Sequence, residues 1–470
     1  MKTKEASVKL AFYMTGSYAK ILRRCVAFLD WETTAVCPNF QAYTEAKKEP
    51  KLGAIDYLYE GFNEVFERVD VAKFCEEYAS INLSEVLLVD KAHFKKKSGD
   101  YQLRYVCAMG EQLAEVFRKS KPDYILFPII ETIDAMLAYR MAQHFGIRPI
   151  VSSHARFTGR YFFSDSHLEL LPKYTGHVAR SEADAIFAQQ FIEAYRSNPG
   201  PFNIKANIPV AEVYEDFHHD RGVVGRLLQN IRLKRGVEKH NQLINLWINF
   251  QVRFEAIFLP VRRMIFRLIE RFYIKPKPVP AEGYDFFPLH FSPESSINVP
   301  APFYIDQTRI VDKILLERSG DRILVLKEHP AMYGFRPRGF FRSLKNRPFV
   351  SFVSRLTPSV QLIRNAATVY SVTGTACLEA FFMGVHWVQF GNNYLSDWVR
   401  QRSERSEAAT PLELIRDVLS VSKEFALYSP GRSLSDDQVL FSKANVERIC
   451  DHLKFHVEHS GHSSISLVRG

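Results

Sequence analysis

The 470-residue sequence contains only six cysteines, and no two of them have the close spacing of a metal-binding or redox motif. The six are scattered along the chain as Cys25, Cys37, Cys75, Cys107, Cys377 and Cys450. A zinc site is therefore not expected. Isolated thiols of this kind are typical of a protein kept in a reducing compartment, so we expect a cytoplasmic protein.

Long apolar runs are also missing. No run of about 18 apolar residues occurs, so no transmembrane helix is expected. The first residues lead into a short strand-like run, 8–14, which lacks the long apolar core and cleavage site of a signal peptide. No repeat of about 20–50 residues is visible. The hydrophobic fraction of 46% is that of a globular protein. The chain is too long for one ordinary core, and we expect two or three domains.

Positive charge is concentrated in one segment. From Arg221 to Lys277 there are 13 Lys and Arg residues against three acids, an excess of +10 that equals the net charge of the whole chain. Arg263, Arg267 and Arg271 recur among large apolar residues, as in a basic amphipathic helix that lies on an anionic membrane surface. The alternative is a helical insertion packed on the protein with a solvated basic face. No recognised nucleic-acid-binding module accompanies the charge, so nucleic acid is not expected as a partner.

Strand-like and helical stretches alternate on both sides of that segment. In the first part, the pattern predicts strands at 8–14, 26–29, 86–89, 124–128 and 147–152, and helices at 101–120 and 132–145. In the second part, it predicts strands at 286–289, 323–327, 349–352, 369–372 and 387–390, and helices at 307–318, 359–365 and 376–383. This alternation predicts an α/β fold with two facing, doubly wound domains on parallel sheets.

The same pattern predicts that the chain is divided into four segments. Residues 1–200 form an acceptor-side α/β domain, and 201–283 form the basic helical insertion with a Pro-rich linker at its end. Residues 284–455 form a nucleotide-sugar-binding α/β domain, and 456–470 form a disordered tail.

The stretch Thr373-Gly374-Thr375 carries the strongest chemical signal. It follows the predicted strand 369–372 and opens the predicted helix 376–383, so a small-residue turn joins a buried strand to a helix. Backbone N–H groups at a helix N-terminus bind anions, typically phosphates. Glu379 lies one helical turn further on and is a candidate for a ribose hydrogen bond. The alternatives are a plain helix cap for the turn and a solvated helix face for Glu379.

Other candidates follow neighbouring predicted strands. Lys327, Glu328, His329 and Pro330 end the strand 323–327, and we interpret them as nucleotide contacts, with a plain strand-to-helix cap as the alternative. Strand side chains alternate, so one of Lys327 and Glu328 faces the ligand and the other faces away. His290 and Glu294 follow the strand 286–289 and are catalytic candidates. Arg336 can neutralise a phosphate or a sugar carboxylate.

Taken in order, these motifs resemble the bacterial capsule polysaccharide biosynthesis proteins. The resemblance rests on Phe287-Pro288-Leu289-His290, Lys327-Glu328-His329-Pro330, Thr373-Gly374-Thr375 and Leu378-Glu379-Ala380, and it covers about 110 residues. That family includes retaining β-Kdo transferases, which use CMP-Kdo. The resemblance implies a GT-B-like fold, with the nucleotide held by the carboxy-terminal domain. It also implies a nucleotide sugar and a glycan or glycolipid acceptor as partners, with no cofactor.

The resemblance directs attention to acids of the first part. A retaining transferase needs a carboxylate nucleophile or a protected ion pair at the anomeric carbon. We predict Glu131 and Asp134, at the end of the strand 124–128, with Asp165 as a further candidate; helix capping is the alternative for the first two. Arg156 and Arg160 are candidates for binding the sugar carboxylate or the acceptor.

The sequence therefore predicts a metal-independent, retaining glycosyltransferase that moves a Kdo-like sugar from a CMP donor to a capsule or other surface polysaccharide. It would be cytoplasmic and peripheral on the inner face of the inner membrane. No DxD-like pair stands at a clear strand end, so no metal is expected. Two alternatives remain: another sugar-nucleotide enzyme of the same fold, such as a UDP-sugar transferase or epimerase, and a non-catalytic capsule biosynthesis or export protein.

Overall fold

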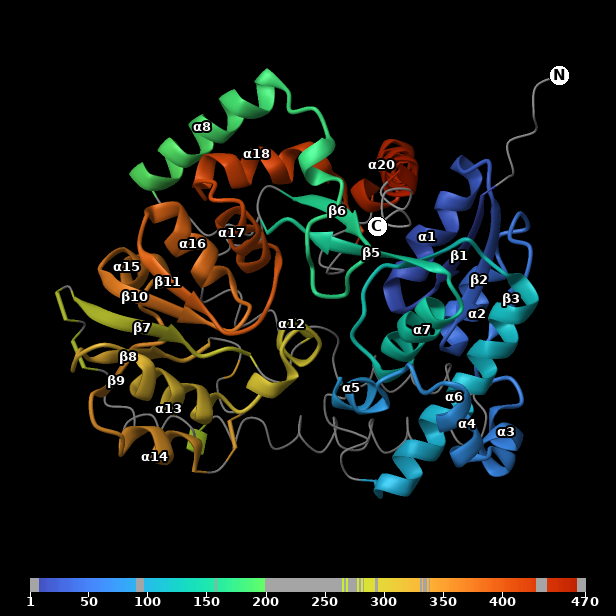
Figure 1. The fold of residues 1–470 in the computed structure, drawn as a ribbon, viewed down its shortest axis with the longest axis horizontal. Coiled ribbons are helices and arrows are strands. Elements are labelled where there is room, and N and C mark those ends of the chain that lie inside the picture. The colour runs from blue at the N-terminus through green and yellow to red at the C-terminus, as the bar shows by residue number, and fades with distance from the viewer. Residues whose placement is uncertain are drawn as a thin grey trace. The chain divides into compact units, whose positions relative to one another are not determined.

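The computed structural model describes residues 8–89, 97–156, 159–198, 283–291, 295–329, 339–427 and 438–462, with isolated positions between them (Figure 1). The chain forms two compact units. The first contains the chain up to Ala179 and again from Asp417, and the second contains most of the chain from Arg180 to Arg416. Nearly all of the predicted basic insertion lies outside the described residues, so its contact with a membrane stays a prediction.

The first unit is built on a seven-stranded sheet with the order β12-β6-β5-β4-β1-β2-β3. Strands β1 to β5 are parallel where they pair, β6 runs antiparallel to β5, and β12 runs antiparallel to β6. The strand bounds are β1 (Lys9–Tyr13), β2 (Glu32–Cys37), β3 (Ile55–Tyr57), β4 (Tyr124–Phe127), β5 (Arg148–His154), β6 (Arg160–Ser164) and β12 (Lys423–Glu424).

Helices cover both faces of this sheet. On one face, apolar residues of α1 (Ala19–Cys25), α2 (Phe40–Ala46) and α20 (Lys443–His462) share a core with alternate residues of β1, β4 and β5. On the other face, α7 (Ile133–His144) packs through Tyr139 on Phe127 of β4, with ring centroids 6.0 Å apart. Against α7 pack α5 (Leu83–Leu88) and α6 (Gly99–Ser120), and α3 (Phe62–Arg68) and α4 (Val71–Glu77) pack on α6.

The second unit is built on a five-stranded, fully parallel sheet with the order β11-β10-β7-β8-β9. Its strands are β7 (Tyr284–Pro288), β8 (Leu324–Lys327), β9 (Val350–Val353), β10 (Ala366–Ser371) and β11 (His386–Gln389). One face packs on α13 (Gln307–Glu317) and α14 (Phe340–Lys345), and the other on α15 (Ser359–Arg364) and α16 (Thr375–Met383). The other α-helices in the described part of the chain are α8 (Glu182–Ser197), α12 (Ser295–Asn298), α17 (Tyr394–Glu404) and α18 (Pro411–Val421), and α18 leads the chain back to the first unit.

The two sheets share one strand order. When the first five strands of each unit are numbered along the chain, both sheets read 3-2-1-4-5, which is the order of the Rossmann fold. The prediction of an α/β fold with two doubly wound, Rossmann-like domains is therefore confirmed. Ligands of such sheets bind where the strand order reverses, beyond the carboxyl ends of the first and fourth strands. Those places are the ends of β1 and β4 in the first unit and of β7 and β10 in the second.

Two predicted strands are wrong. Residues 26–29 begin with a short 3-10 helix, Val26–Phe28, which continues α1, and 86–89 fall at the end of α5. Apolar runs of about four residues do not distinguish a strand from a buried helix turn. At α5 the side chain of Asn82 accepts a hydrogen bond from the amide of Glu85, 3.1 Å away, and this cap starts the helix. The other predicted strands and helices named above are confirmed within a few residues.

The domain boundaries differ from the predicted ones. The second unit takes α8, because Phe191 and Tyr195 contact Phe382 of α16, although 1–200 was predicted to be a single domain. The first unit takes the chain from Asp417 onward, because Ile449 and Leu453 of α20 lie in its core. Residues 456–462, predicted to be disordered, complete α20. Neither contact leaves a signal in local sequence, because both join segments far apart in the chain.

Acid should destabilise the docking of α20. His452 and His456 are 2% and 3% exposed, and burial lowers the pKa of His452 to about 3 and that of His456 to about 4. The unfolded chain then binds more protons than the folded chain below the ordinary histidine pKa of about 6.5. Stability should be full above that pH and fall below it, by up to about 1.4 kcal/mol per pH unit for each histidine.

Chemical denaturation between pH 7.5 and pH 5 measures this loss. His452 stacks on Phe163 and Phe455, so His452→Phe keeps the ring contacts and removes the titrating group. The variant should lose less stability on acidification than the intact chain, while His177→Phe, at an exposed position, should follow the intact chain. Equal acid sensitivity of His452→Phe and the intact chain would contradict this explanation.

Candidate functional site

The turn after β10 forms the centre of a polar site in the second unit. Gly374 is the N-cap of α16 and has an extended backbone, and its position supplies no side-chain hydrogen bond to the helix. A Cβ atom on Gly374 would lie 2.8 Å from Cε1 of His290 and 3.0 Å from Oγ of Ser371, so the turn requires glycine. The amides of the first turn of α16 thus keep the orientation in which helix N-termini bind anions.

His290 supports this turn from the end of β7. Its Nε2 accepts a hydrogen bond from the amide of Val372 at 3.0 Å and lies 3.3 Å from Oγ of Ser371. Its backbone is held on both sides by Gln307, whose Oε1 and Nε2 lie 2.7 and 3.0 Å from the His290 amide and carbonyl. The structure therefore places His290, predicted to be catalytic, beneath the turn, where it fixes the ends of β7 and β10.

Lys327 and Glu379 approach the turn from two other elements. Lys327 ends β8, is 7% exposed, and donates from Nζ to Oγ of Ser359 at 2.8 Å. Glu379 of α16 is 8% exposed and accepts from the hydroxyl of Thr375 at 3.0 Å. Burial lowers the pKa of Lys327 to about 8, and the opposing charge of Glu379 limits that shift. Burial also raises the pKa of Glu379 to about 7, against the effects of Thr375 and Lys327.

This group brings together most of the predicted nucleotide contacts. Glu379 interacts with both Thr375 and Lys327, and Thr373 and Gly374 form the turn that leads into α16. An ammonium ion, hydroxyl groups and a helix N-terminus at the point where strand order reverses are the groups that hold a phosphate. The arrangement can therefore bind the phosphate of a nucleotide.

Glu328 and Arg336 form a separate ion pair on the other side of β8. Arg336 donates from Nε and Nη2 to the two carboxylate oxygens of Glu328 at 2.8 and 2.7 Å, and from Nη2 to the carbonyl of His290 at 2.8 Å. Both side chains are 3–4% exposed. Lys327 and Glu328 thus face opposite sides of β8, as strand alternation requires. Arg336 was predicted to bind a sugar, and in this structure its guanidinium braces the β7 and β8 ends.

His329 follows Glu328 in the chain and is partly buried. Its ring lies 5.9 Å from that of Phe291, and burial, followed by the charges of Arg336 and Lys327, lowers the pKa of His329 to about 4. The imidazole is therefore neutral at pH 7, and it can contact a base or a ribose without adding charge. Pro330 and Glu294, two further predicted site residues, lie outside the described residues.

In the first unit, Asp134 lies at the corresponding point of the sheet. It stands in the first turn of α7, beyond the end of β4, and its Oδ2 accepts from the hydroxyl of Tyr13, the last residue of β1, at 3.0 Å. Burial raises the pKa of Asp134, and hydrogen bonds from its own backbone amide, Thr132 and Tyr13 oppose this shift. Asp134 is half-buried as a whole residue. Glu131 is also half-buried and lies on the connection between β4 and α7.

The third acid lies elsewhere. Asp165 follows β6, which runs antiparallel to β5, and Ser164 pairs with Val151 rather than with the end of β5. Asp165 therefore lies away from the carboxyl ends of the parallel strands, where Asp134 lies. Its carboxylate pairs with Lys173 at 3.2 Å on the surface. The sequence pattern predicted no strand at 160–164, so the hairpin with β5 that sets the antiparallel direction of β6 was missed.

Both predicted arginines flank the β5–β6 turn and carry interactions within the first unit. Arg156 has a left-handed backbone with φ 66° and pairs with Glu169. Arg160 donates from Nε and Nη2 to Oγ and the carbonyl of Ser422 at 3.1 and 3.0 Å, and Glu424 lies 3.5 Å from its Nη1. The structure thus uses Arg160 to attach β6 to the returning chain that forms β12.

Two residues that the sequence did not flag join the site of the second unit. Ser359 stands at the junction of β9 and α15, and the preceding Thr357-Pro358 is a strand-to-helix signal that identifies its position. Tyr195 of α8 lies beside Glu379, and burial together with that carboxyl group raises its pKa far above the ordinary value. No local pattern indicates Tyr195, because α8 is more than a hundred residues from α16 along the chain.

Within the described part of the chain, no three His, Cys, Asp or Glu side chains are grouped so that they could hold a metal ion. Among the described helices, none combines the length and the apolar character that a bilayer crossing requires.

Three solved structures illustrate the similarity of this chain to known proteins, and all three are distant. Thermosulfurimonas dismutans KpsC, a beta Kdo 2,7 transferase, aligns over 73% of this chain and 89% of its own, at 10% identity and a TM-score of 0.33. KpsC of the same organism, a beta Kdo 2,4 transferase, aligns over 65% and 85%, at 12% identity and a TM-score of 0.36. UDP-GlcNAc 2-epimerase from Methanocaldococcus jannaschii aligns over 96% and 100%, at 13% identity and a TM-score of 0.22.

At these TM-scores the similarity transfers neither an activity nor a site residue to this chain. No protein-family model and no curated protein matches the sequence.

Proposed function

We propose that this protein is a glycosyltransferase that moves an acidic, Kdo-like sugar from a CMP-activated donor to a capsule or other surface polysaccharide. One observation supports the proposal: the N-terminus of α16, with Lys327, Ser359 and Thr375 near it, lies where the strand order of a Rossmann-like sheet reverses, and helix ends at such points bind phosphates in other proteins. The resemblance of the surrounding motifs to the capsule biosynthesis family supplies the donor and the acceptor. No cofactor and no metal are part of the proposal.

The proposed reaction needs charge stabilisation on the leaving nucleotide and a carboxylate at the anomeric carbon. When the bond between the anomeric carbon and the phosphate oxygen breaks, CMP leaves with the electron pair of that bond. The helix end and Lys327 would stabilise the negative charge on its phosphate, as a metal ion does in other enzymes. The carboxylate of Asp134 would form a bond to the anomeric carbon. The acceptor hydroxyl would then displace that carboxylate and release its proton, with net retention.

The predicted location is part of the proposal. We place the enzyme in the cytoplasm, peripheral on the inner membrane, with residues 221–277 in contact with anionic lipid. The charge of that segment supports this placement.

A thermal-shift titration with CMP, CDP, UMP, UDP and GDP tests the donor assignment. A ligand that binds only the folded state raises its stability by RT ln(1 + [L]/Kd), so a micromolar site is visible at millimolar ligand. We expect selective stabilisation by CMP. Stabilisation by UDP or GDP instead would favour another sugar-nucleotide enzyme, and no response to any nucleotide would favour a non-catalytic protein.

Nucleotide affinity should depend on pH through Glu379. A bound phosphate one helical turn from Glu379 favours the protonated carboxyl group, whose pKa in the free protein is about 7. Binding should therefore be tightest below pH 7 and weaken above it, by at most about tenfold per pH unit while this one proton is taken up. Loss of charge on Lys327 above about pH 8 adds to the decline.

Calorimetric titration with CMP in buffers of different ionisation enthalpy measures the proton taken up. Between pH 7 and 8, Glu379→Gln should bind CMP with less pH dependence than the intact chain, because Lys327 is then the titrating group that remains. If the CMP affinity of Glu379→Gln depends on pH as steeply as that of the intact chain, the proton is taken up by another group.

A further inference from the structure

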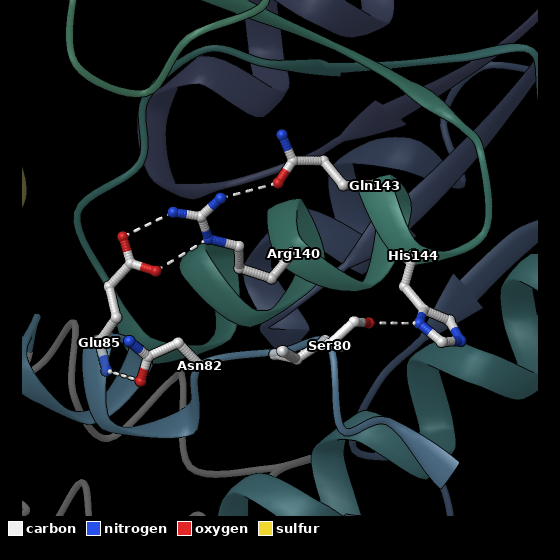
Figure 2. Close-up of a pocket in the computed structure, with 7 residues that line it drawn as sticks. Ser80, Asn82, Glu85, Arg140, Gln143 and His144 are labelled. Carbon is white, nitrogen blue, oxygen red and sulfur yellow. Dashed lines mark hydrogen bonds and ion pairs between the residues drawn. The ribbon is translucent and has the colours of Figure 1, made fainter.

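The first unit contains a hollow that the proposed reaction does not use. It has a volume of about 580 Å³ and is lined by Ile81 and by the six polar residues labelled in Figure 2. These side chains come from two places: α5 with the segment that leads into it, and the second half of α7. Cavities of about 300–1,000 Å³ hold small ligands in proteins.

The hollow is separate from the strand ends. Asp134 lies in the first turn of α7, whereas His144 is its last residue, and a helix rises about 1.5 Å per residue. Ten residues therefore separate the two positions by about 15 Å along the helix axis. A ligand in the hollow would not occupy the place of a group that reacts at Asp134.

The charges in the hollow cancel one another. Arg140 donates from Nε and Nη2 to the two carboxylate oxygens of Glu85 at 2.9 and 2.6 Å, as Figure 2 shows. A hydrogen bond from His167 and then the ion pair with Arg140 lower the pKa of Glu85 to about 2, so the pair stays ionised at physiological pH. An ionic ligand would meet no uncompensated charge from this pair, and the hollow is better suited to a neutral polar ligand.

The remaining polar groups are held in fixed positions by the protein. The Oε1 atom of Gln143 accepts from Nη1 of Arg140 at 2.9 Å, and the Oδ1 atom of Asn82 accepts from the amide of Glu85 at 3.1 Å. Oγ of Ser80 and Nδ1 of His144 lie 2.9 Å apart. Each of these side chains keeps further donor or acceptor capacity, such as the amide hydrogens of Asn82 and Nε2 of His144.

We propose that this hollow binds a neutral saccharide, one or two sugar residues of a glycan chain. Planar carboxylate, guanidinium, amide and imidazole groups match the paired donors and acceptors of adjacent sugar hydroxyls. Because these groups are already oriented by hydrogen bonds within the protein, less conformational entropy is lost when the ligand binds. The site shares no residue with the proposed nucleotide site, which is built from residues of the second unit.

Saturation-transfer NMR on the full chain tests the assignment with maltotriose, cellotriose and mannotriose at millimolar concentration. We expect transfer to at least one of these probes, with CMP unable to displace it. The double variant Gln143→Ala, His144→Ala changes two exposed residues and should weaken the binding of the probe by about tenfold or more. The matched control Gln190→Ala, at an exposed position of α8, should bind as the intact chain does.

The proposal is overturned if no trisaccharide gives a signal, or if the double variant binds the probe unchanged. It is also overturned if inorganic phosphate or citrate binds in a way that the double variant abolishes, because the site would then take anions. If the melting temperature of the double variant is lower than that of the intact chain, the single variant His144→Gln replaces it and tests the proposal in the same way. Nucleotide binding is measured on the same samples, so failure of the saccharide site is distinguished from failure of the proposed transferase.

Discussion

Replacing Asp134 with Asn is expected to lower kcat for sugar transfer by about 10²–10⁴-fold, with little change in the affinity for CMP. Asp134 stands at the end of β4, where the strand order of the first sheet reverses, and it is half-buried beside Tyr13. An amide of the same size cannot attack an anomeric carbon. The nucleotide contacts that we propose lie in the second unit and are untouched by the change.

The change should leave the fold intact. Burial raises the pKa of Asp134, which means that the surrounding protein already disfavours its charge. Asn keeps an acceptor for the hydroxyl of Tyr13, whose own pKa burial raises well above the usual value, so that the tyrosine remains a donor. The melting temperature of Asp134→Asn should therefore equal or exceed that of the intact chain.

Two matched variants decide between the predicted acids. Glu131→Gln changes a neighbouring carboxyl group on the β4–α7 connection, and Asp165→Asn changes an acid paired with Lys173 at the surface. Both should keep most of the activity. If Glu131→Gln abolishes transfer while Asp134→Asn does not, the nucleophile is Glu131, and our assignment is wrong. A covalent sugar adduct trapped on Asp134 and seen by mass spectrometry would identify the residue directly.

The strand-to-helix turns of both sheets could be predicted from sequence because their signals are local. Thr373-Gly374-Thr375 combines a preceding apolar strand, a glycine and the start of a helix, and Thr132 caps α7 through the amide of Ala135 at 3.3 Å. Lys327 and Glu328 could be assigned to opposite faces by strand alternation alone. Signals of this kind depend on neighbouring residues, and folding preserves them.

What the sequence did not reveal depends on contacts between distant segments. In the sequence, Arg336 looks like a cation that is available to a ligand. In the structure, its guanidinium donates hydrogen bonds to Glu328 and to the carbonyl of His290. Tyr195 reaches Glu379 only because α8 packs on α16. Asp165 is an exception, because it follows β6, a strand that was not predicted from the sequence and that forms a hairpin with its neighbour β5. Charge and residue type identify candidates, whereas tertiary packing decides which of them remain available to a ligand.

Replacing Lys327 with Met is expected to weaken CMP binding by about 2–5 kcal/mol, which corresponds to about 30-fold or more in Kd. The ammonium group of Lys327 is buried, hydrogen-bonded to Ser359 and opposed by Glu379, so solvent screens it little. A phosphate at the N-terminus of α16 would lose the cation that we assign to it. Met retains the apolar stem and fills most of the same space.

The folded state should tolerate this substitution, which separates a binding role from a structural one. Burial has already lowered the pKa of Lys327 to about 8, so removing its charge also removes a desolvation cost. Glu379, with a pKa of about 7, can take up a proton when its partner is gone. Lys313→Met, on the exposed face of α13, is the matched control and should bind CMP normally. If Lys327→Met binds CMP as tightly as the intact chain but melts much lower, Lys327 is a structural residue, and the phosphate site must lie elsewhere.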